Sequence, residues 1–103
     1  MKKYLDDLEA VIQDRKNKDP QESYVASLIK EKEKIILKIK EESQELAEAF
    51  LENDPDSIKH ESADLLFHLM VLLSEKNIPF DEVLLELKKR EGTSGHEEKK
   101  SRK

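Results

Sequence analysis

Apolar residues recur along this chain every three, four or seven positions, the spacing at which side chains share one face of an α-helix. Three prolines divide the pattern into segments, because proline is tolerated at a helix start but not in its interior. The pattern predicts helices at about residues 2 to 17, 23 to 31, 33 to 52, 55 to 76 and 80 to 90. We therefore expect an all-α fold, a helical bundle of four to five helices.

The predicted helix ends carry residues that suit them. Asp54, followed by proline, is typical of an N-cap with proline at the first helical position, and Ser23 can cap the short second helix. Both glycines, Gly92 and Gly95, lie near the C-terminus. We therefore expect no backbone position that demands a positive φ in residues 1 to 91.

The composition is that of one small, highly charged helical domain. Of the 103 residues, 42% are charged, 36% are hydrophobic and 5% are aromatic, so the core is small and aliphatic. We expect a single helical domain over residues 1 to 91 and a flexible basic tail over residues 92 to 103. The net charge of −5 and a pI near 5.3 argue against nucleic-acid binding.

Several classes of protein are excluded by what the sequence lacks. Without cysteine, the chain has neither a disulfide framework nor a thiolate metal site. No stretch reaches the roughly 18 to 20 apolar residues of a membrane span. The first ten residues contain no apolar signal core, so we expect a cytoplasmic protein with no membrane partner.

The third and fourth predicted helices each carry two carboxylates, three positions apart, beside an apolar stripe. On the third helix, Glu42 falls in a gap of the stripe and Glu45 lies next to it. On the fourth, Glu61 and Asp64 begin a line that continues with His68. Uncompensated buried carboxylates cost on the order of several kcal/mol each, so we expect a cation between the helices.

A divalent cation fits these carboxylates better than the alternatives. Lys38, one turn before Glu42, balances only part of the charge, and a solvated acidic face would not place both pairs at packing positions. Oxygen ligands suit Mg²⁺, with Mn²⁺ as the second choice, rather than Zn²⁺. A ferritin-type di-iron site would need Glu-x-x-His, which none of the three histidines provides. We expect His68 to support the ligands by a hydrogen bond, the ligands being Glu42, Glu45, Glu61 and Asp64.

The apolar run in the fourth predicted helix indicates a partner chain. From residue 65 to residue 73 every position except His68 is apolar. A helix that is apolar nearly all round is buried, and so short a chain has little with which to bury it. We therefore expect a homodimer.

The order Glu42-x-x-Glu45 and Glu61-x-x-Asp64 resembles the ExxE and ExxD motifs of the all-α, MazG-like nucleoside-triphosphate pyrophosphatases. Within that superfamily the chain resembles the phosphoribosyl-ATP pyrophosphohydrolase family. The matching segments span nearly the whole chain in order: DRKNKDPQESYVASLI, KIKEESQE, ESADLLFHLMVLL and ELKKREGTSGHEEKKSRK. Four residues depart from the family pattern: Val25 stands where threonine is usual, Glu31 and Lys40 where glycines are usual, and Phe67 where tyrosine is usual.

The resemblance implies hydrolysis of phosphoribosyl-ATP to phosphoribosyl-AMP and pyrophosphate, the second step of histidine biosynthesis. It implies Mg²⁺ on the four acids, direct attack by water on the α,β phosphoanhydride, and Glu41 or Glu42 as the catalytic base. The basic tail would close over the phosphoribosyl group. The implied substrate-binding residues are Arg15, Lys16, Ser23, Tyr24, Lys38, Arg90, Ser94, Gly95, Lys99 and Arg102.

Other interpretations remain open. Ser23 can be only a helix cap, Tyr24 only a packed ring, and the tail only a frayed end. A house-cleaning pyrophosphatase acting on other nucleotides would keep the four acids without needing the Ser-Tyr segment or the Ser-Gly tail. A non-catalytic helical dimerisation module would explain the leucine-rich faces but would leave the acids without a role.

Overall fold

The computed structural model describes residues 1 to 92 and confirms the all-α prediction for them. Five helices follow one another along the chain: α1 (Lys2–Arg15), α2 (Tyr24–Lys30), α3 (Lys32–Glu52), α4 (Pro55–Glu75) and α5 (Phe80–Lys89). Each boundary lies within two residues of the predicted one. No helix in this part of the chain is both long and apolar enough to cross a membrane.

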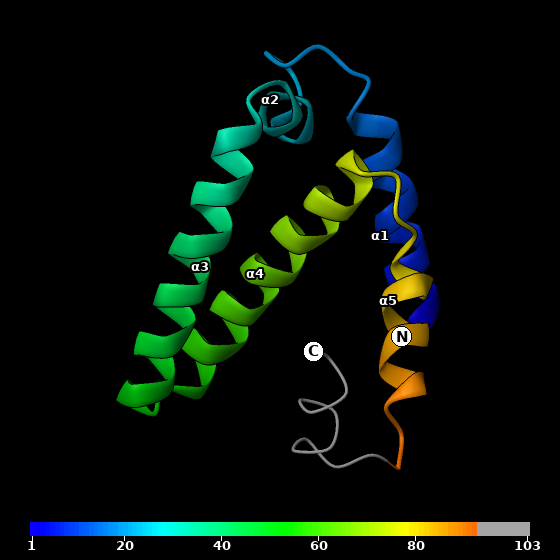
Figure 1. The fold of residues 1–103 in the computed structure, drawn as a ribbon. Coiled ribbons are helices and arrows are strands. Elements are labelled where there is room, and N and C mark those ends of the chain that lie inside the picture. The colour runs from blue at the N-terminus through cyan, green and yellow to red at the C-terminus, as the bar shows by residue number, and fades with distance from the viewer. Residues whose placement is uncertain (93–103) are drawn as a thin grey trace.

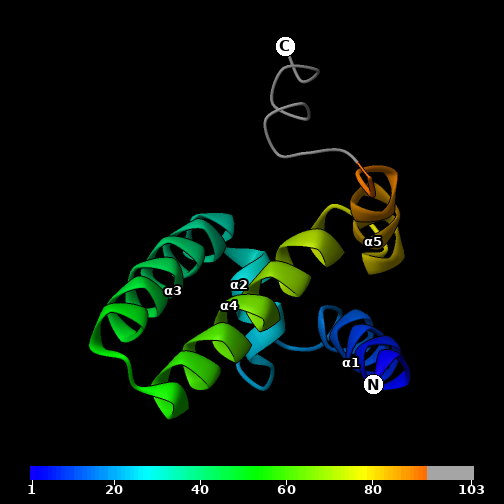
Figure 2. The same ribbon diagram turned by 90° about the horizontal axis from the view of Figure 1, so that it is seen from below.

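The longest helices, α3 and α4, form an antiparallel hairpin, and the other helices gather at its open end (Figure 1). α2 lies across that end, next to the start of α3. α1 packs on the other side of α4, so that α4 lies between α3 and α1 (Figure 2). The turn end of the hairpin lies apart from α1, α2 and α5 (Figures 1 and 2).

The hydrophobic core occupies only the end where the helices meet. Six buried residues make up its centre: Ile12, Val25, Leu28, Ile35, Met70 and Val71. Towards the turn fewer apolar side chains are buried: Ala49 is buried, but Phe50 is 66% and Leu51 77% exposed. The core cluster therefore covers only about half of the hairpin, and the acidic segment of α3, residues 41 to 45, lies beyond it.

Two helix starts are capped as predicted. The hydroxyl of Ser23 accepts a hydrogen bond from the backbone N–H of Ala26 at 3.1 Å. A carboxylate oxygen of Asp54 accepts the N–H groups of Asp56 at 3.2 Å and Ser57 at 3.4 Å, with proline at the first position of α4. These caps satisfy N–H groups that have no partner within their own helix.

The prediction that residues 1 to 91 hold no positive φ is wrong. Asn53, at the end of α3, has φ 58°, and Asn77, just after α4, has φ 56°. Asparagine tolerates the left-handed conformation better than most residues, because its short polar side chain can bond locally. It therefore takes the place at these helix ends that glycine more often fills.

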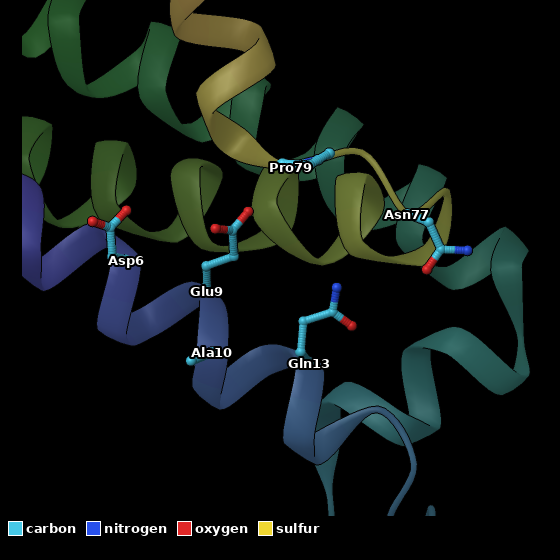
Figure 3. A pocket seen from close by; sticks show the side chains of 6 residues that line it. All are labelled: Asp6, Glu9, Ala10, Gln13, Asn77 and Pro79. Atoms are coloured by element: carbon cyan, nitrogen blue, oxygen red, sulfur yellow. The ribbon is translucent and has the colours of Figure 1, made fainter.

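Helix α5 is fastened to α1 by polar contacts at its first turn. The backbone N–H of Phe80 donates to Glu9 Oε2 at 2.7 Å, and Lys2 Nζ lies 2.7 Å from Asp81 Oδ1. A shallow hollow of about 290 Å³ lies beside this junction (Figure 3), lined by Asp6, Glu9, Ala10, Gln13, Asn77 and Pro79. Glu9 already accepts the N–H of Phe80 at the start of α5. We therefore attribute the hollow to the way α5 is attached to α1 and not to a ligand site.

Candidate metal and substrate site

The turn between α3 and α4 determines which carboxylates face each other. Glu45 and Glu61 each lie eight residues from Asn53, and Glu42 and Asp64 each lie eleven residues from it. Residues equally far from the turn of an antiparallel hairpin reach the same level. The electrostatics agree: burial and Asp64 raise the pKa of Glu42, and burial and Glu45 raise that of Glu61.

Each helix of the hairpin brings three potential ligands together. In each set, one ligand atom per residue lies within 4.8 Å of the others; the sets are Glu41, Glu42 and Glu45 on α3, and His60, Glu61 and Asp64 on α4. Each set contains two of the four predicted metal ligands, Glu42 and Glu45 on α3 and Glu61 and Asp64 on α4. Glu41 and Lys38, predicted from the same segment, lie beside them.

Glu42 is the most deeply placed of the four acids. Its residue is only 5% exposed, and within the described residues its Oε2 has no hydrogen-bond partner. Burial raises the pKa of Glu42, and the charges of Asp64 and Glu45 raise it further, whereas His68 and Lys38 act in the opposite direction. A buried carboxylate oxygen with no donor is costly unless a cation or a proton neutralises it.

Glu61 repeats the pattern from the facing helix. Its Oε1 is buried and finds no hydrogen-bond partner among the described residues. Burial raises the pKa of Glu61 first, and the adjacent Glu45 carboxylate raises it further. Two neighbouring carboxylates on different helices therefore need one positive charge between them.

The donor set fits a divalent ion of the Mg²⁺ type. The four acids offer only carboxylate oxygens, the ligands that Mg²⁺ and Mn²⁺ favour. Two of these oxygens are buried and unpartnered, which is the environment that a bound cation would relieve. Lys38 relieves it only in part: it lowers the pKa of Glu42, but its Nζ contacts the exposed Glu41 carboxylate at 3.5 Å.

His68 links α4 to α2 through two hydrogen bonds. It is 6% exposed, and its Nδ1 lies 2.8 Å from the backbone oxygen of Asp64. A carbonyl oxygen only accepts, so Nδ1 carries the proton and donates. In the neutral ring Nε2 then accepts the hydroxyl hydrogen of Tyr24 at 2.8 Å. This chain of bonds fixes Tyr24 beside the carboxylates.

Two of the predicted substrate residues lie in structural contacts away from the acids. Lys16 Nζ donates to the backbone oxygen of Ser74 at 3.0 Å and to Asn77 Oδ1 at 3.1 Å. Ser74 lies ten residues beyond Asp64 on α4, about 15 Å along the helix axis. Ser23, besides capping α2, donates its hydroxyl hydrogen to the backbone oxygen of Arg15 at 3.0 Å. Both residues thus join α1 to its neighbours.

Arg15 is the last residue of α1, and the other predicted cations, Arg90, Lys99 and Arg102, lie at the C-terminal end of the chain. Arg90, at the end of α5, pairs with Glu86 at 3.4 Å. α4 lies between α5 and α3 (Figure 2). The tail residues Ser94, Gly95, Lys99 and Arg102 lie outside the described residues.

His60 was missed as a member of the acidic site. Its Nε2 lies 3.3 Å from Asp64 Oδ2, and its side chain is 73% exposed. The signal was present in the sequence, because His60 and Asp64 are four residues apart and so face the same side of α4. His60 lies at the outer edge of the ligand group, where it can support or join it.

The four departures from the family pattern fit their positions. Val25 is 5% exposed and belongs to the apolar core. Glu31 has φ −120°, a conformation that does not call for glycine, and Lys40 is exposed on α3. Phe67 stacks on Tyr24 with the ring centroids 6.3 Å apart. None of the four is a predicted metal ligand.

Comparisons with known proteins identify the family of this chain. The sequence model of the family described as "Phosphoribosyl-ATP pyrophosphohydrolase" matches residues 5–91. A curated relative from Novosphingobium aromaticivorans is 54% identical over 92% of this chain and 90% of its own length. A relative from Rhizorhabdus wittichii is 50% identical over 95% of this chain and 93% of its own length. One from Haloarcula marismortui is 44% identical over 84% of this chain and 91% of its own length. All three are named "Phosphoribosyl-ATP pyrophosphatase". These matches confirm the resemblance found in the sequence.

Proposed function

This chain belongs to the phosphoribosyl-ATP pyrophosphohydrolase family, and we propose that, as an enzyme of that family, it hydrolyses phosphoribosyl-ATP in histidine biosynthesis. The products would be phosphoribosyl-AMP and pyrophosphate. The observation that carries the proposal is that one carboxylate oxygen of Glu42 on α3 and one of Glu61 on α4 are buried and, within the described residues, have no hydrogen-bond partner. An acidic site can hold a triphosphate only through cations, so these oxygens explain how the substrate is bound.

In this proposal Glu42, Glu45, Glu61 and Asp64 hold Mg²⁺, with Mn²⁺ as a substitute. When bound, the ion would supply positive charge against the phosphate oxygens and the departing pyrophosphate. The hairpin holds the ligands at fixed levels, so little reorganisation accompanies binding. Lys38 adds a side-chain cation at the edge of the site, where the raised pKa caused by Glu41 keeps it protonated.

The reaction we propose is a direct displacement by water. The water oxygen forms a bond to the α phosphorus while the bond to the bridging oxygen breaks, and its electron pair leaves with pyrophosphate. The water's proton passes to Glu42 or Glu41. Glu42 is the buried candidate, and Glu41 is its more exposed neighbour on the same helix. No covalent enzyme intermediate is needed.

Hydrolysis should be tested by the identity of the products. With Mg²⁺ present, the protein should release pyrophosphate and no single phosphates from phosphoribosyl-ATP, and a chelator should stop the release. ATP and dCTP serve as the comparison substrates, assayed by ion-exchange separation of the products. Release confined to ATP or dCTP would place the activity with the house-cleaning pyrophosphatases. The absence of release from all three would leave a helical dimerisation module.

We infer a homodimer from the half-covered side of α4. Leu65 and Leu69 lie four residues apart on this helix, are only half-buried, and are not members of the buried core. On α3, closer to the turn of the hairpin, Phe50 and Leu51 are also largely exposed. A stripe of this kind becomes stable when a second copy covers it.

The dimer should appear in analytical ultracentrifugation. We expect a mass of about twice the 12.0 kDa of one chain at micromolar concentrations. Leu69→Glu should shift the protein to the monomer while its helical circular dichroism remains, because a charge is costly to bury at an interface. The exposed Leu85→Glu on α5 is the control and should leave the mass unchanged. A wild-type protein that sediments as a monomer would refute the dimer.

A further inference from the structure

A second concave surface adjoins the carboxylates, between α2 and α3. Its walls are Tyr24 and Leu28 from α2 and Lys34, Leu37, Lys38 and Glu41 from α3. The three- and four-residue spacings within each group place its members on one face of their helix. The volume of about 360 Å³ is within the range of sites for small ligands. Glu41 belongs both to this groove and to the acidic cluster, so the two are continuous.

Along α3, two lysines one turn apart are followed by the acidic cluster. The acids lie at positions 41, 42 and 45, Lys38 lies one turn before them, and Lys34 lies one turn before Lys38. Lys34 is therefore about 10 Å along the axis from Glu41. Leu28 and Leu37 provide an apolar surface in the groove between its two ends. A ligand that fits this arrangement carries one phosphate group at the acids, held there through cations, a second phosphate at Lys34, and a flat apolar group between them.

Tyr24 gives the groove a rigid aromatic side. The hydrogen bond to His68 fixes its hydroxyl, and the ring stacks on Phe67 at an interplanar angle of 17°. The residue nevertheless remains 49% exposed. An aromatic ring that is fixed in place and half open to solvent can pack against a base without first losing conformational freedom.

We propose that this groove binds the base and the second ribose phosphate of phosphoribosyl-ATP, and that Lys34 recognises that second phosphate. This inference rests on the proposed function and names the part of the site that separates phosphoribosyl-ATP from ATP. The triphosphate lies at the carboxylates, the base lies against Tyr24 and the two leucines, and the far phosphate reaches Lys34. Within the described residues Lys34 pairs with Glu31 alone, at 3.6 Å and with both side chains about half exposed, so it is available to a phosphate.

Steady-state kinetics of Lys34→Gln test the assignment. The KM for phosphoribosyl-ATP should rise about tenfold, the effect of losing one charge-assisted contact, while kcat stays within about twofold. The inhibition constant of ATP, used as a competitor, should not change, because ATP lacks the second phosphate. The same loss for both ligands would overturn the proposal, since Lys34 would then hold the triphosphate. No change in the KM for phosphoribosyl-ATP would also overturn it.

Lys40→Gln provides the matched control. Lys40 is exposed on the same helix, lies closer in sequence to the carboxylates than Lys34 and does not line the groove. If removal of any positive charge from α3 weakened substrate binding, Lys40→Gln would show it at least as strongly. We expect its kinetic constants to match those of the wild type. An equal rise in KM for both variants would count against a specific role for Lys34.

Binding of the product separates this inference from the proposed function. Isothermal titration with phosphoribosyl-AMP and with AMP, both in chelator, involves neither metal nor catalysis. The wild type should bind phosphoribosyl-AMP at least about tenfold more tightly than AMP, and Lys34→Gln should lose the difference. Equal binding of the two by the wild type overturns the groove assignment even if hydrolysis is observed. Selective binding that depends on Lys34 supports it even if no pyrophosphate is released.

Discussion

Replacing Glu42 with glutamine is expected to lower kcat/KM for phosphoribosyl-ATP by at least about a thousandfold, because a lost metal ligand removes several kcal/mol of charge stabilisation from the transition state. The carboxylate is 5% exposed and lies level with Asp64, so no other side chain on α3 can take its place. Pyrophosphate release should be followed at saturating Mg²⁺. A variant that keeps more than a tenth of the activity would exclude Glu42 as a ligand and as the base.

The same substitution should make the metal-free protein more stable. Glutamine has nearly the shape of glutamate but no charge, so the cost of burying an unpartnered carboxylate falls away. We expect the free energy of unfolding in urea to rise by roughly 1 kcal/mol in chelator at pH 7.5. Lost activity together with gained stability distinguishes a functional residue from one needed for folding.

A control on the same helix is Glu48→Gln. Glu48 is exposed and accepts a hydrogen bond from Gln44 at 3.0 Å. Its replacement should change neither kcat/KM nor the free energy of unfolding by more than about 0.5 kcal/mol. If Glu48→Gln lowered activity as much as Glu42→Gln, the overall charge of α3 would be the cause rather than one ligand.

Adding Mg²⁺ is expected to raise the melting temperature by about 10 to 20 °C at a hundredfold excess over the dissociation constant. Binding to the folded state alone contributes about 2.7 kcal/mol under that condition, and 1 kcal/mol moves the midpoint of a domain of this size by about 4 to 8 °C. Calorimetry at constant ionic strength, with NaCl replacing MgCl₂, removes the general effect of salt. The double variant Glu42→Gln, Glu61→Gln should show no shift.

The size of this shift should depend on pH in a defined direction. Burial raises the folded-state pKa values of Glu42 and Glu61 above their ordinary value of 4.5, so the folded protein binds more protons than the unfolded chain above that pH. Stability of the metal-free protein therefore falls as pH rises from about 4.5 through the raised values. Protons also compete with Mg²⁺ for the same oxygens. The Mg²⁺-induced rise should be larger at pH 7.5 than at pH 5.

Measurements at pH 5 and above avoid a contribution of opposite sign. Hydrogen bonds from Ser57 lower the folded-state pKa of Asp54 below its ordinary value of 3.8. That group contributes stability above pH 3.8, and the contribution is lost as pH falls through the lowered value. A melting temperature that did not respond to Mg²⁺ at either pH would contradict the metal site.

Most of the fold and the core of the site could be read from the sequence because they depend on local spacing. Helical periodicity gave the five helices, and Ser23 and Asp54 marked two of their starts. The pairing of Glu42 with Asp64 follows from two helices of known direction and one short turn. Each of these inferences uses the geometry of a single helix or hairpin.

Features that depend on how separate helices cross could not be read in the same way. The groove at Lys34 exists because α2 lies against α3 at a particular angle, and no pattern within either helix specifies that angle. Lys16 reaches across to α4 for the same reason. Asn53 and Asn77 show a different limit, since asparagine is common on exposed surfaces and only its place at a helix end distinguishes the left-handed ones.

The symmetric placement of the carboxylates about Asn53 has a consequence for how this chain can vary in length. Surface turns ordinarily tolerate insertions and deletions. One residue inserted within α3 after Glu45, or within α4 before Glu61, is different, because it would rotate the acids of that helix by about 100° and shift them by about 1.5 Å relative to the turn. Both facing pairs of acids would be lost together. Relatives that keep the reaction should therefore vary in length at the connection between α1 and α2, and keep the number of residues between Glu45 and Glu61 unchanged.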